Sequence, residues 1–300
     1  MLRVMPDPAA HENLASDPTL QHRDIQLRDV RLHCVEAGSG PLVLLLHGFP
    51  EFWYTWRHLI PALAAAGFRV VAPDMRGVNT SSKPHGVAAY AIDVLVKDID
   101  DLIAALGAER AHVVGHDWGS GIAWSFAMQH PEHLQRLAIL NGPHPQRLLS
   151  GLRKPSQLLK SWYMFFFQLP LLPELVMRRN GFAMLLSGMR NDPTRPGAYS
   201  EDDIARYREA LARPGALTAF INYYRGMRKV RPRMSWETIR ADTLIIWGER
   251  DKYLGRDLAV PDARLVTNAR VEYLPDGTHW VHHDEPERVA ELLIAFLRGA

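Results

Sequence analysis

The chain has 300 residues, of which 47% are hydrophobic and 23% are charged, and its formal net charge is +2. This is the composition of an ordinary globular protein, and the length predicts one large α/β domain or such a domain with a smaller insert. The small net charge and the shortness of the one basic cluster, Met227 to Arg233, argue against a nucleic-acid partner.

Several features bear on where the protein works. The first 18 residues are polar and interrupted by prolines, so they lack the apolar core of a signal peptide. The most apolar stretch, Trp162 to Val176, contains Gln168, Pro170 and Pro173 and is shorter than the roughly 20 residues of a membrane span. The single cysteine, Cys34, cannot form an internal disulfide. We therefore expect a cytoplasmic protein without a membrane span.

Apolar strand-like runs alternate with helix-like segments in the first half of the chain. Strands are predicted at residues 30–37, 43–47, 68–74, 111–117 and 137–141, with helices at 56–67, 92–107 and 121–130. Such alternation predicts βαβ units, and therefore a mostly parallel, twisted sheet with helices on both faces.

The alternation stops after Asn141 and resumes near residue 243. Residues 142–236 contain aromatic, proline-punctuated and helix-prone segments, whereas strands are again predicted at 243–249 and 271–275, followed by a helix at 287–299. We expect one α/β core, residues 1–141 and 237–300, with an inserted helical cap at 142–236. The apolar stretch of this cap would line a substrate passage or the underside of a lid, and a peripheral membrane contact is the alternative.

The stretch GHDWG, Gly115 to Gly119, joins a predicted strand to a predicted helix. This is the setting of a nucleophile elbow, G-x-Nuc-x-G, whose central side chain is exposed at the top of the sheet. Asp117 holds the position that serine usually occupies. Ser120 is not the nucleophile of such a frame, because Trp118 stands two residues before it, and we expect it at the start of the helix.

Two more candidates follow strands in the second half of the chain. Asp251 lies in GERD and His279 lies in DGTHW. In open α/β sheets ligands bind beyond the carboxyl ends of the strands, and the chain order nucleophile, acid, histidine is that of the α/β-hydrolase triad. The segment HGFP, His47 to Pro50, matches the loop whose amide joins that of the residue after the nucleophile in an oxyanion hole.

A carboxylate nucleophile restricts the chemistry. With an ordinary pKa of about 3.9, Asp117 is ionised at neutral pH and needs no base. Its attack on a saturated carbon gives an ester between enzyme and substrate. A histidine oriented by an acid could then activate water for cleavage of that ester, while the amides of Phe49 and Trp118 stabilise the oxyanion.

The leaving group decides between two substrate classes. A halide leaves as a stable anion and needs only weak donors, whereas an epoxide oxygen leaves as a basic alkoxide and needs an acid such as a phenol. The predicted cap contains Tyr163, Tyr223 and Tyr224. An epoxide is therefore the favoured substrate.

With these residues the sequence resembles the epoxide hydrolases of the α/β-hydrolase superfamily, over nearly the whole chain after the first two dozen residues. The resemblance rests on HGFPE, GHDWG, LNGP, FQLP, NYYR, GERD and GTHW. It implies an α/β-hydrolase fold and an ether-bond hydrolase that needs no cofactor and no metal. Its site residues would be Asp117 as nucleophile, Asp251 and His279 as charge pair, Phe49 and Trp118 as oxyanion donors, and Tyr163 and Tyr224 as activators of the epoxide oxygen.

The second activating tyrosine is the less secure assignment of the two. Tyr224 is preferred to Tyr223 because it directly precedes Arg225, as in the family pattern. The partners would be a small apolar epoxide and water, and a homodimer is left open. Substrate-binding residues are expected at His47, Pro50, Trp162, Phe166, Phe167 and Tyr223.

The chain departs from the family pattern at Val78, where relatives often have an aromatic residue, and at WVHHDEP, where glutamines are commoner. With His279, the histidines His282 and His283 form an H-x-x-H-H string. A further ligand at matching spacing is not evident. We therefore expect no metal and a solvated start of the last helix, with Asp284 as its N-cap.

A haloalkane dehalogenase is the alternative enzyme, because it shares the Asp-Trp elbow. Those enzymes have a second halide donor as asparagine in the loop that holds Phe49 here or as a cap tryptophan, and Trp162 keeps that option open. A haloacetate dehalogenase is less favoured, since Trp118 stands where that group has arginine. A receptor without turnover would not need His279.

Overall fold

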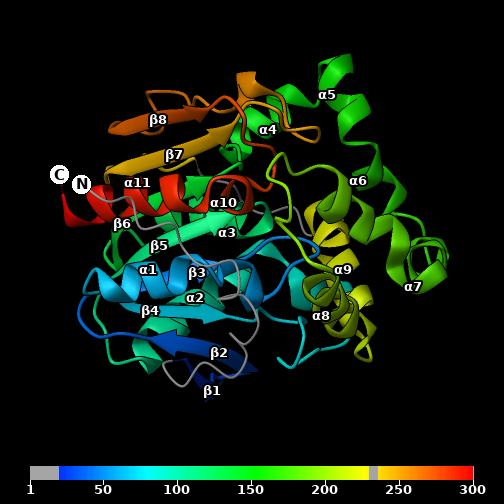
Figure 1. Ribbon diagram of the computed structural model, residues 1–300, viewed down its shortest axis with the longest axis horizontal. Helices are drawn as coiled ribbons and strands as arrows, with labels where there is room; N and C mark the ends of the chain where they lie inside the picture. Colours follow the sequence, from blue (N-terminus) through cyan, green and yellow to red (C-terminus); the bar gives the residue numbers. More distant parts are fainter. Residues whose placement is uncertain (1–19, 230–235, 300) are drawn as a thin grey trace.

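The computed structural model describes residues 20–229 and 236–299 (Figure 1). In this part of the chain eight strands form one sheet in the order β1-β2-β4-β3-β5-β6-β7-β8. The β1–β2 and β2–β4 pairs are antiparallel and the other pairs are parallel. The strands are β1 Gln21–Gln26, β2 Arg31–Ala37, β3 Leu42–Leu46, β4 Arg69–Pro73, β5 Ala111–His116, β6 Leu134–Leu140, β7 Thr243–Gly248 and β8 Ala269–Leu274.

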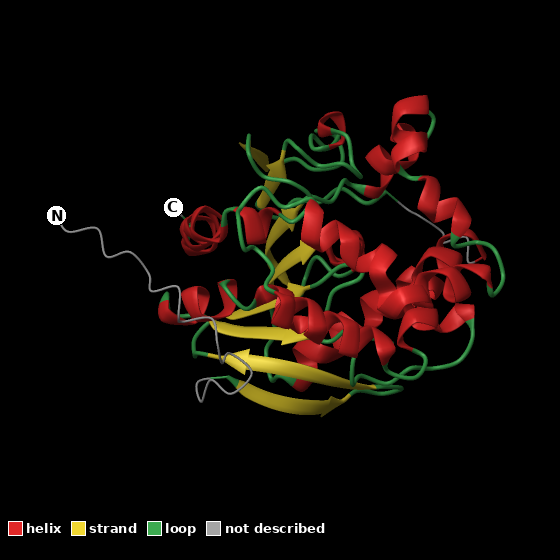
Figure 2. Ribbon diagram, turned by 45° about the vertical axis from the view of Figure 1, so that its right-hand side comes forward, coloured by secondary structure: helices red, strands yellow, loops and turns green. Residues whose placement is uncertain are grey.

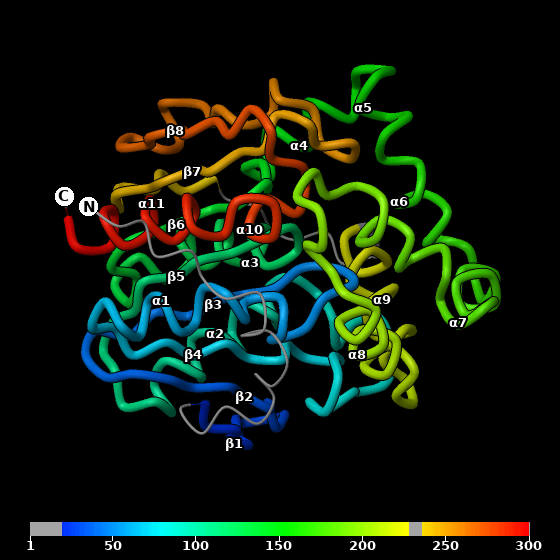
Figure 3. Tube along the Cα trace, viewed as in Figure 1, coloured from blue at the N-terminus to red at the C-terminus, as the bar shows by residue number. Residues whose placement is uncertain are grey.

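The helices of the core cover both faces of the sheet, as Figures 1 and 3 show, with α1 and α11 on one face and α2 and α3 on the other. They are η3 Trp53–Trp56, α1 Leu59–Ala65, η4 Val87–Tyr90, α2 Ile92–Ala105, α3 Trp118–Gln129, η5 Arg256–Leu258, α10 Val281–Asp284 and α11 Pro286–Arg298. The predicted α/β-hydrolase fold, a mostly parallel sheet flanked by helices, is confirmed.

The pattern of apolar residues explains why most strands could be predicted from the sequence and why β1 was missed. The central strands β3 and β5 are buried along their whole length, because helices cover both faces of a parallel sheet. The edge strand β1, QHRDIQ, is almost entirely exposed. It is polar and pairs only with β2, so its sequence carries no apolar periodicity.

The segment between β6 and β7 contains only helices and loops within the described residues, and we call helices α4 to α9 the insert. Figures 1 and 2 show these helices gathered beyond one end of the sheet. Helix α9 packs against η4 and α2 of the core. No described helix is both long enough and apolar enough to cross a bilayer. The insert helices are α4 Pro145–Gly151, α5 Pro155–Lys160, α6 Trp162–Phe166, α7 Leu172–Asn191 (kinked at 179–182), α8 Glu201–Ala212 and α9 Ala216–Lys229.

Candidate active site

Asp117 lies at the sharp turn between β5 and α3. Its φ of 49° and ψ of −116° are unusual for a residue with a side chain, and such backbone strain is concentrated at functional sites. The turn is tight enough that a Cβ on Gly119 would lie 1.9 Å from the carbonyl oxygen of Leu46. The local geometry is thus that of a nucleophile elbow with a carboxylate at its apex.

The loop after β3 brings a backbone donor to this carboxylate. The Phe49 amide donates to Asp117 Oδ1 at 2.7 Å. A Cβ on Gly48 would lie 2.4 Å from the Cβ of Asp117, so glycine permits the close approach. Trp118 is the first residue of α3, and its amide has no acceptor one turn earlier in the helix. The Phe49 amide therefore contacts the Asp117 carboxylate, and the other expected oxyanion donor, the Trp118 amide, directly follows Asp117 in the chain.

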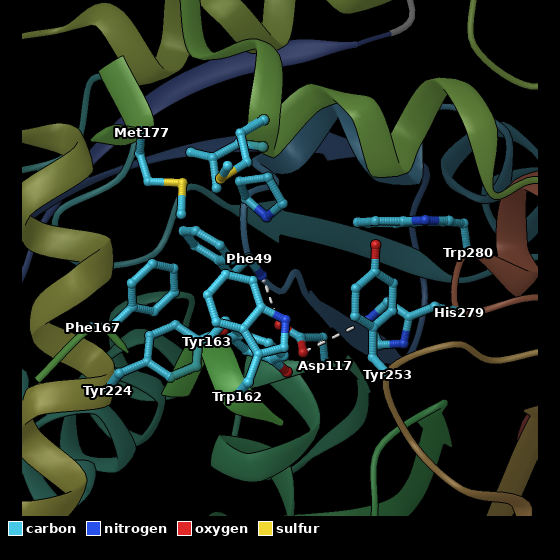
Figure 4. Close-up of a pocket in the computed structure, with 13 residues that line it drawn as sticks. Phe49, Asp117, Trp162, Tyr163, Phe167, Met177, Tyr224, Tyr253, His279 and Trp280 are labelled. Atoms are coloured by element: carbon cyan, nitrogen blue, oxygen red, sulfur yellow. Dashed lines mark hydrogen bonds and ion pairs between the residues drawn. The ribbon is translucent and has the colours of Figure 1, made fainter. Parts of the chain in front are cut away.

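His279 lies between two carboxylates. Its Nδ1 is 2.8 Å from Asp251 Oδ2 and its Nε2 is 3.7 Å from Asp117 Oδ2. The other oxygen of Asp251 accepts the amides of Tyr253 and Leu254 at 2.7 and 2.8 Å. The Asp251 carboxylate thus fixes the imidazole with Nε2 facing Asp117 (Figure 4).

The pKa values of this pair follow from burial and charge. Burial alone would lower the pKa of His279, but the charges of Asp251 and Asp117 outweigh it and raise the pKa to about 10. Burial would raise the pKa of Asp251, and the neighbouring His279 outweighs it, so this pKa is lowered. In the free protein at neutral pH the pair is an imidazolium beside the ionised carboxylate of Asp251.

The three candidate tyrosines are not equivalent. Tyr163 and Tyr224 line the cavity that also contains Asp117, and their ring centroids are 5.9 Å apart. The hydroxyl of Tyr223 donates to the carbonyl oxygen of Arg76 at 2.7 Å, so it is already engaged in the core. The Tyr224 hydroxyl accepts from the Trp118 indole N–H and keeps its own proton to donate, so the geometry favours Tyr224 over Tyr223 as the second phenol of the site.

Both cavity phenols have raised pKa values. Burial, and then the charge of Asp117, raise the pKa of Tyr163 and of Tyr224 well above 10. The two hydroxyls therefore carry their protons at neutral pH and can donate hydrogen bonds.

Two cavities reach the carboxylate, and Asp117, Tyr163 and Tyr224 line both. The first, of about 140 Å³, also includes His279 (Figure 4). The second, of about 400 Å³, runs along α3 and α9 and includes Trp118 and Tyr223. The rest of the first cavity is mainly apolar: Phe49, Pro50, Trp162, Phe167, Met177, Met184, Leu185, Tyr253 and Trp280.

Two other predicted substrate-binding residues lie outside this wall. His47 is buried and its Nε2 accepts the Met75 amide at 3.1 Å, so it supports the loop behind Phe49. Phe166 packs its ring against those of Trp162 and Phe167. Both support groups that line the cavity.

Residues that sequence reasoning did not single out hold the site together. Glu51 accepts the Gly48 amide at 3.0 Å and lies 2.8 Å from His116 Nδ1, while His116 Nε2 lies 2.8 Å from the carbonyl oxygen of His279. Asn141 donates to Asp251 Oδ2 at 2.8 Å. All of them stand inside or next to the motifs HGFPE, GHDWG and LNGP, and that adjacency was the available signal.

The expectation of a solvated start of the last helix is wrong. His282 and His283 are each only 1% exposed, and their Nε2 atoms lie 2.8 and 2.9 Å from the Thr55 hydroxyl, which donates to Glu51 at 2.5 Å. Burial lowers the pKa of His282 to about 4 and that of His283 well below its ordinary value. These are neutral histidines within a buried hydrogen-bond network.

The N-cap assignment is also wrong. Asp284 belongs to α10 and accepts the amide and hydroxyl of Thr278 at 2.7 and 2.6 Å. Glu285 is the N-cap of α11 and Pro286 is its first residue. The Asp284 carboxylate thus stabilises the turn just before His279.

With respect to ligands for a metal, Glu51, His282 and His283 each offer an atom within 4.8 Å of the others. The Thr55 hydroxyl lies among these atoms and hydrogen-bonds to all three. The arrangement is therefore explained by hydrogen bonding among protein groups.

Residues 41–286 match the α/β hydrolase fold family. The AB hydrolase superfamily protein YfhM of Bacillus subtilis (strain 168) is 41% identical over 92% of this chain and 97% of its own length. Epoxide hydrolase 4 of Mus musculus is 37% identical over 94% of this chain and 81% of its own. The chain belongs to the epoxide hydrolase family of α/β hydrolases.

Solved structures agree with this membership. A point mutant of an epoxide hydrolase from Bacillus megaterium, crystallised with its product, a naphthyloxy propanediol, has a TM-score of 0.85 and 33% identity, covering 92% of this chain and 100% of that one. This member of the epoxide hydrolase family is a hydrolase, as the sequence predicted.

Proposed function

We propose that the protein hydrolyses an apolar epoxide to a vicinal diol through an ester on Asp117. One observation carries the proposal: an ionisable carboxylate at a nucleophile elbow shares its cavity with two buried phenols, Tyr163 and Tyr224. An ester or amide hydrolase would not need that pair. Relatives that are named epoxide hydrolases, at 33% to 37% identity, support the same conclusion.

In the first step Asp117 attacks one ring carbon of the epoxide. A bond forms between a carboxylate oxygen and that carbon while the ring C–O bond breaks. Tyr163 and Tyr224 donate hydrogen bonds to the departing oxygen, and one of them supplies the proton that makes it a hydroxyl. The Asp117 charge that raises the pKa of both phenols is lost in the ester, so proton donation becomes easier as the reaction proceeds.

In the second step water attacks the carbonyl carbon of the Asp117 ester. His279 takes the proton of this water, and Asp251 holds the imidazole in place. The amides of Phe49 and Trp118 stabilise the oxyanion. Collapse of the tetrahedral species breaks the bond to the diol, whose enzyme-derived oxygen takes back the proton from His279. The proton left on the Asp117 carboxyl group then passes to His279 and restores the free enzyme.

The charges around His279 order the two steps. While Asp117 is ionised, the pKa of His279 is about 10 and the ring is a poor base at neutral pH. Esterification removes one of the two carboxylate charges, so the pKa of His279 falls. The ring can then pass its proton to the tyrosinate left by the first step, and the neutral imidazole can accept a proton from water. The base is thus released when the ester forms.

The two cavities support a substrate with an extended apolar part. They have volumes of about 140 and 400 Å³ and share Asp117, Tyr163 and Tyr224, so groups on the two epoxide carbons can extend to either side. We propose helices α4 to α9 as the cap that closes the site.

The free, buried Cys34 fits a reducing compartment. We therefore propose that the protein works in the cytoplasm.

Purified protein incubated with styrene oxide and, in parallel, with a chloroalkane tests the assignment. Diol without chloride is expected, chloride would indicate a haloalkane dehalogenase, and neither product would indicate a binding protein. A single turnover in heavy-oxygen water then tests the ester. The first diol should carry an unlabelled enzyme oxygen, and immediate solvent label in the diol would exclude Asp117 as nucleophile.

A further inference from the structure

The segment between β6 and β7 carries nearly all the exposed large hydrophobic side chains among the described residues. Large hydrophobic side chains on a globular surface normally occur singly, and a cluster of them indicates an interaction site. Among the described residues, the exposed large hydrophobic side chains other than Val260 all belong to the segment between β6 and β7. We call them the apolar rim: Leu149, Leu158, Leu159, Trp162, Phe165, Leu169, Leu171, Leu172, Leu175, Met184 and Met227.

The rim follows the outer side of the insert. Helices α5, α6 and α7 succeed one another there, away from the sheet (Figures 1 and 3). Several rim side chains are far from burial, with Leu159 at 75%, Leu171 at 74% and Trp162 at 55% of full exposure. More than half of each of these three side chains therefore remains exposed to solvent after the chain has folded.

Some residues of the apolar rim also line the two cavities. Trp162 and Met184 are exposed and line the cavity that holds His279. Leu149 and Met227 are exposed and line the larger cavity along α3. An apolar ligand leaving a surface that covers the rim would therefore pass directly into the site.

The part of this segment that contains α4 to α7 has an excess of positive charge, although Lys154 and Arg190 pair with Asp257 and Glu201 from outside it. Residues 145–191 contain seven Lys or Arg and one acidic residue, Glu174. Glu174 is neutralised by Arg225, whose Nη1 lies 2.6 Å from Oε1. Arg153, Arg178 and Arg179 are exposed. Exposed Trp, Phe and Leu beside Lys and Arg are typical of surfaces that lie in the interface of an anionic bilayer.

We propose that the apolar rim docks on the surface of an anionic lipid bilayer, from which apolar epoxides enter the active site. A second copy of the chain fits this surface less well, because its own rim would bring the same positive charges together and would cover the cavity openings. The delivery of substrate rests on the proposed epoxide hydrolysis, whereas the docking itself does not.

Vesicle binding tests the docking. The protein should sediment with vesicles of phosphatidylcholine and phosphatidylglycerol, more weakly with pure phosphatidylcholine, and less at high salt because screening weakens the charge attraction. The variant L159E/L175E should lose about tenfold in affinity for each leucine, and R178S/R179S about fivefold for each arginine. The control A65E/A104E changes the charge by the same amount as L159E/L175E on exposed positions of α1 and α2 and should bind like wild type.

The outcomes separate docking from activity. All variants should keep the circular dichroism spectrum and the rate of styrene oxide hydrolysis in buffer, because the altered residues lie outside the cavity wall. Absence of vesicle binding in a protein that makes diol would overturn the docking and leave the function standing. Binding without diol would do the reverse. Equal binding of L159E/L175E and wild type, or rim-dependent dimerisation without lipid binding, would also overturn the proposal.

Discussion

The pKa of His279 predicts how stability depends on pH. In the folded protein this pKa is raised from 6.5 to about 10, because two carboxylates outweigh the effect of burial. A raised pKa means that the folded state binds the proton more tightly than the unfolded state. The resulting stabilisation is fully present below pH 6.5 and is lost as the pH rises through the folded value.

The size of the effect follows from the shift. The whole shift corresponds to about 5 kcal/mol. Between the two pKa values the free energy of unfolding should fall by about 1.4 kcal/mol for each pH unit on account of this one group. Over the interval from about pH 7.5 to about pH 9.0 the loss is about 2 kcal/mol, which urea unfolding resolves.

Comparison with the variant His279→Gln cancels the contributions of the other titrating groups to the pH dependence of stability. The buried histidines with lowered pKa values, such as His112 and His282, add stability as the pH rises, and that gain is complete near the unfolded pKa of about 6.5. Burial raises the pKa of Cys34, so this thiol lowers the free energy of unfolding at alkaline pH in both proteins. The difference between the two pH profiles therefore belongs to His279, and parallel profiles would refute the charge assignment.

Three further predictions concern activity and packing. His279→Gln should slow ester hydrolysis by about 10²- to 10⁴-fold and should accumulate a protein heavier by the mass of the whole epoxide; mass spectrometry without an adduct would contradict the two-step scheme. Tyr224→Phe should reduce the rate of epoxide opening about 10²-fold in stopped-flow experiments. Tyr223→Phe should keep that rate and should lose about 1 kcal/mol of stability in urea unfolding, because its hydrogen bond to the carbonyl oxygen of Arg76 is lost. The opposite pattern would exchange the roles of the two tyrosines. Glu51→Gln should cost about 3 kcal/mol in urea unfolding, because one buried carboxylate accepts several donors, and an unchanged midpoint would show that the network is dispensable.

The parts of the site that could be predicted from sequence are those that depend on local pattern. Asp117, Asp251 and His279 each follow an apolar run that forms a strand. The carboxyl ends of parallel strands share one edge of a sheet, so proximity in space followed from position in the chain. The distinction between Tyr223 and Tyr224 did not follow, because both lie on α9 and only packing sends one hydroxyl to Arg76.

The network behind the site was out of reach for a different reason. Glu51 and His116 are 65 positions apart, and Thr55 meets His282 across 227 positions. No periodicity encodes such contacts, since they arise only when the loop after β3 packs against the turn after β8. In the sequence, His282 and His283 stand next to the acidic segment DEP, which is typical of a solvated helix start. Their buried hydrogen-bond partner, the Thr55 hydroxyl, comes from the first part of the core and could not be read from the local sequence.

The same network explains how a strained elbow can remain in place. Glu51 binds the amide of Gly48, and His116, which directly precedes Asp117, reaches the carbonyl oxygen of His279. The oxyanion loop, the elbow and the histidine turn are therefore fixed to one another by a single buried chain of hydrogen bonds. In the proposed mechanism, alkylation of Asp117 changes the charge in front of this chain of hydrogen bonds and not the groups behind it. The proposed oxyanion donors would thus keep their positions when the charge of Asp117 is lost, and pre-organised donors of this kind are the ones that stabilise a transition state most.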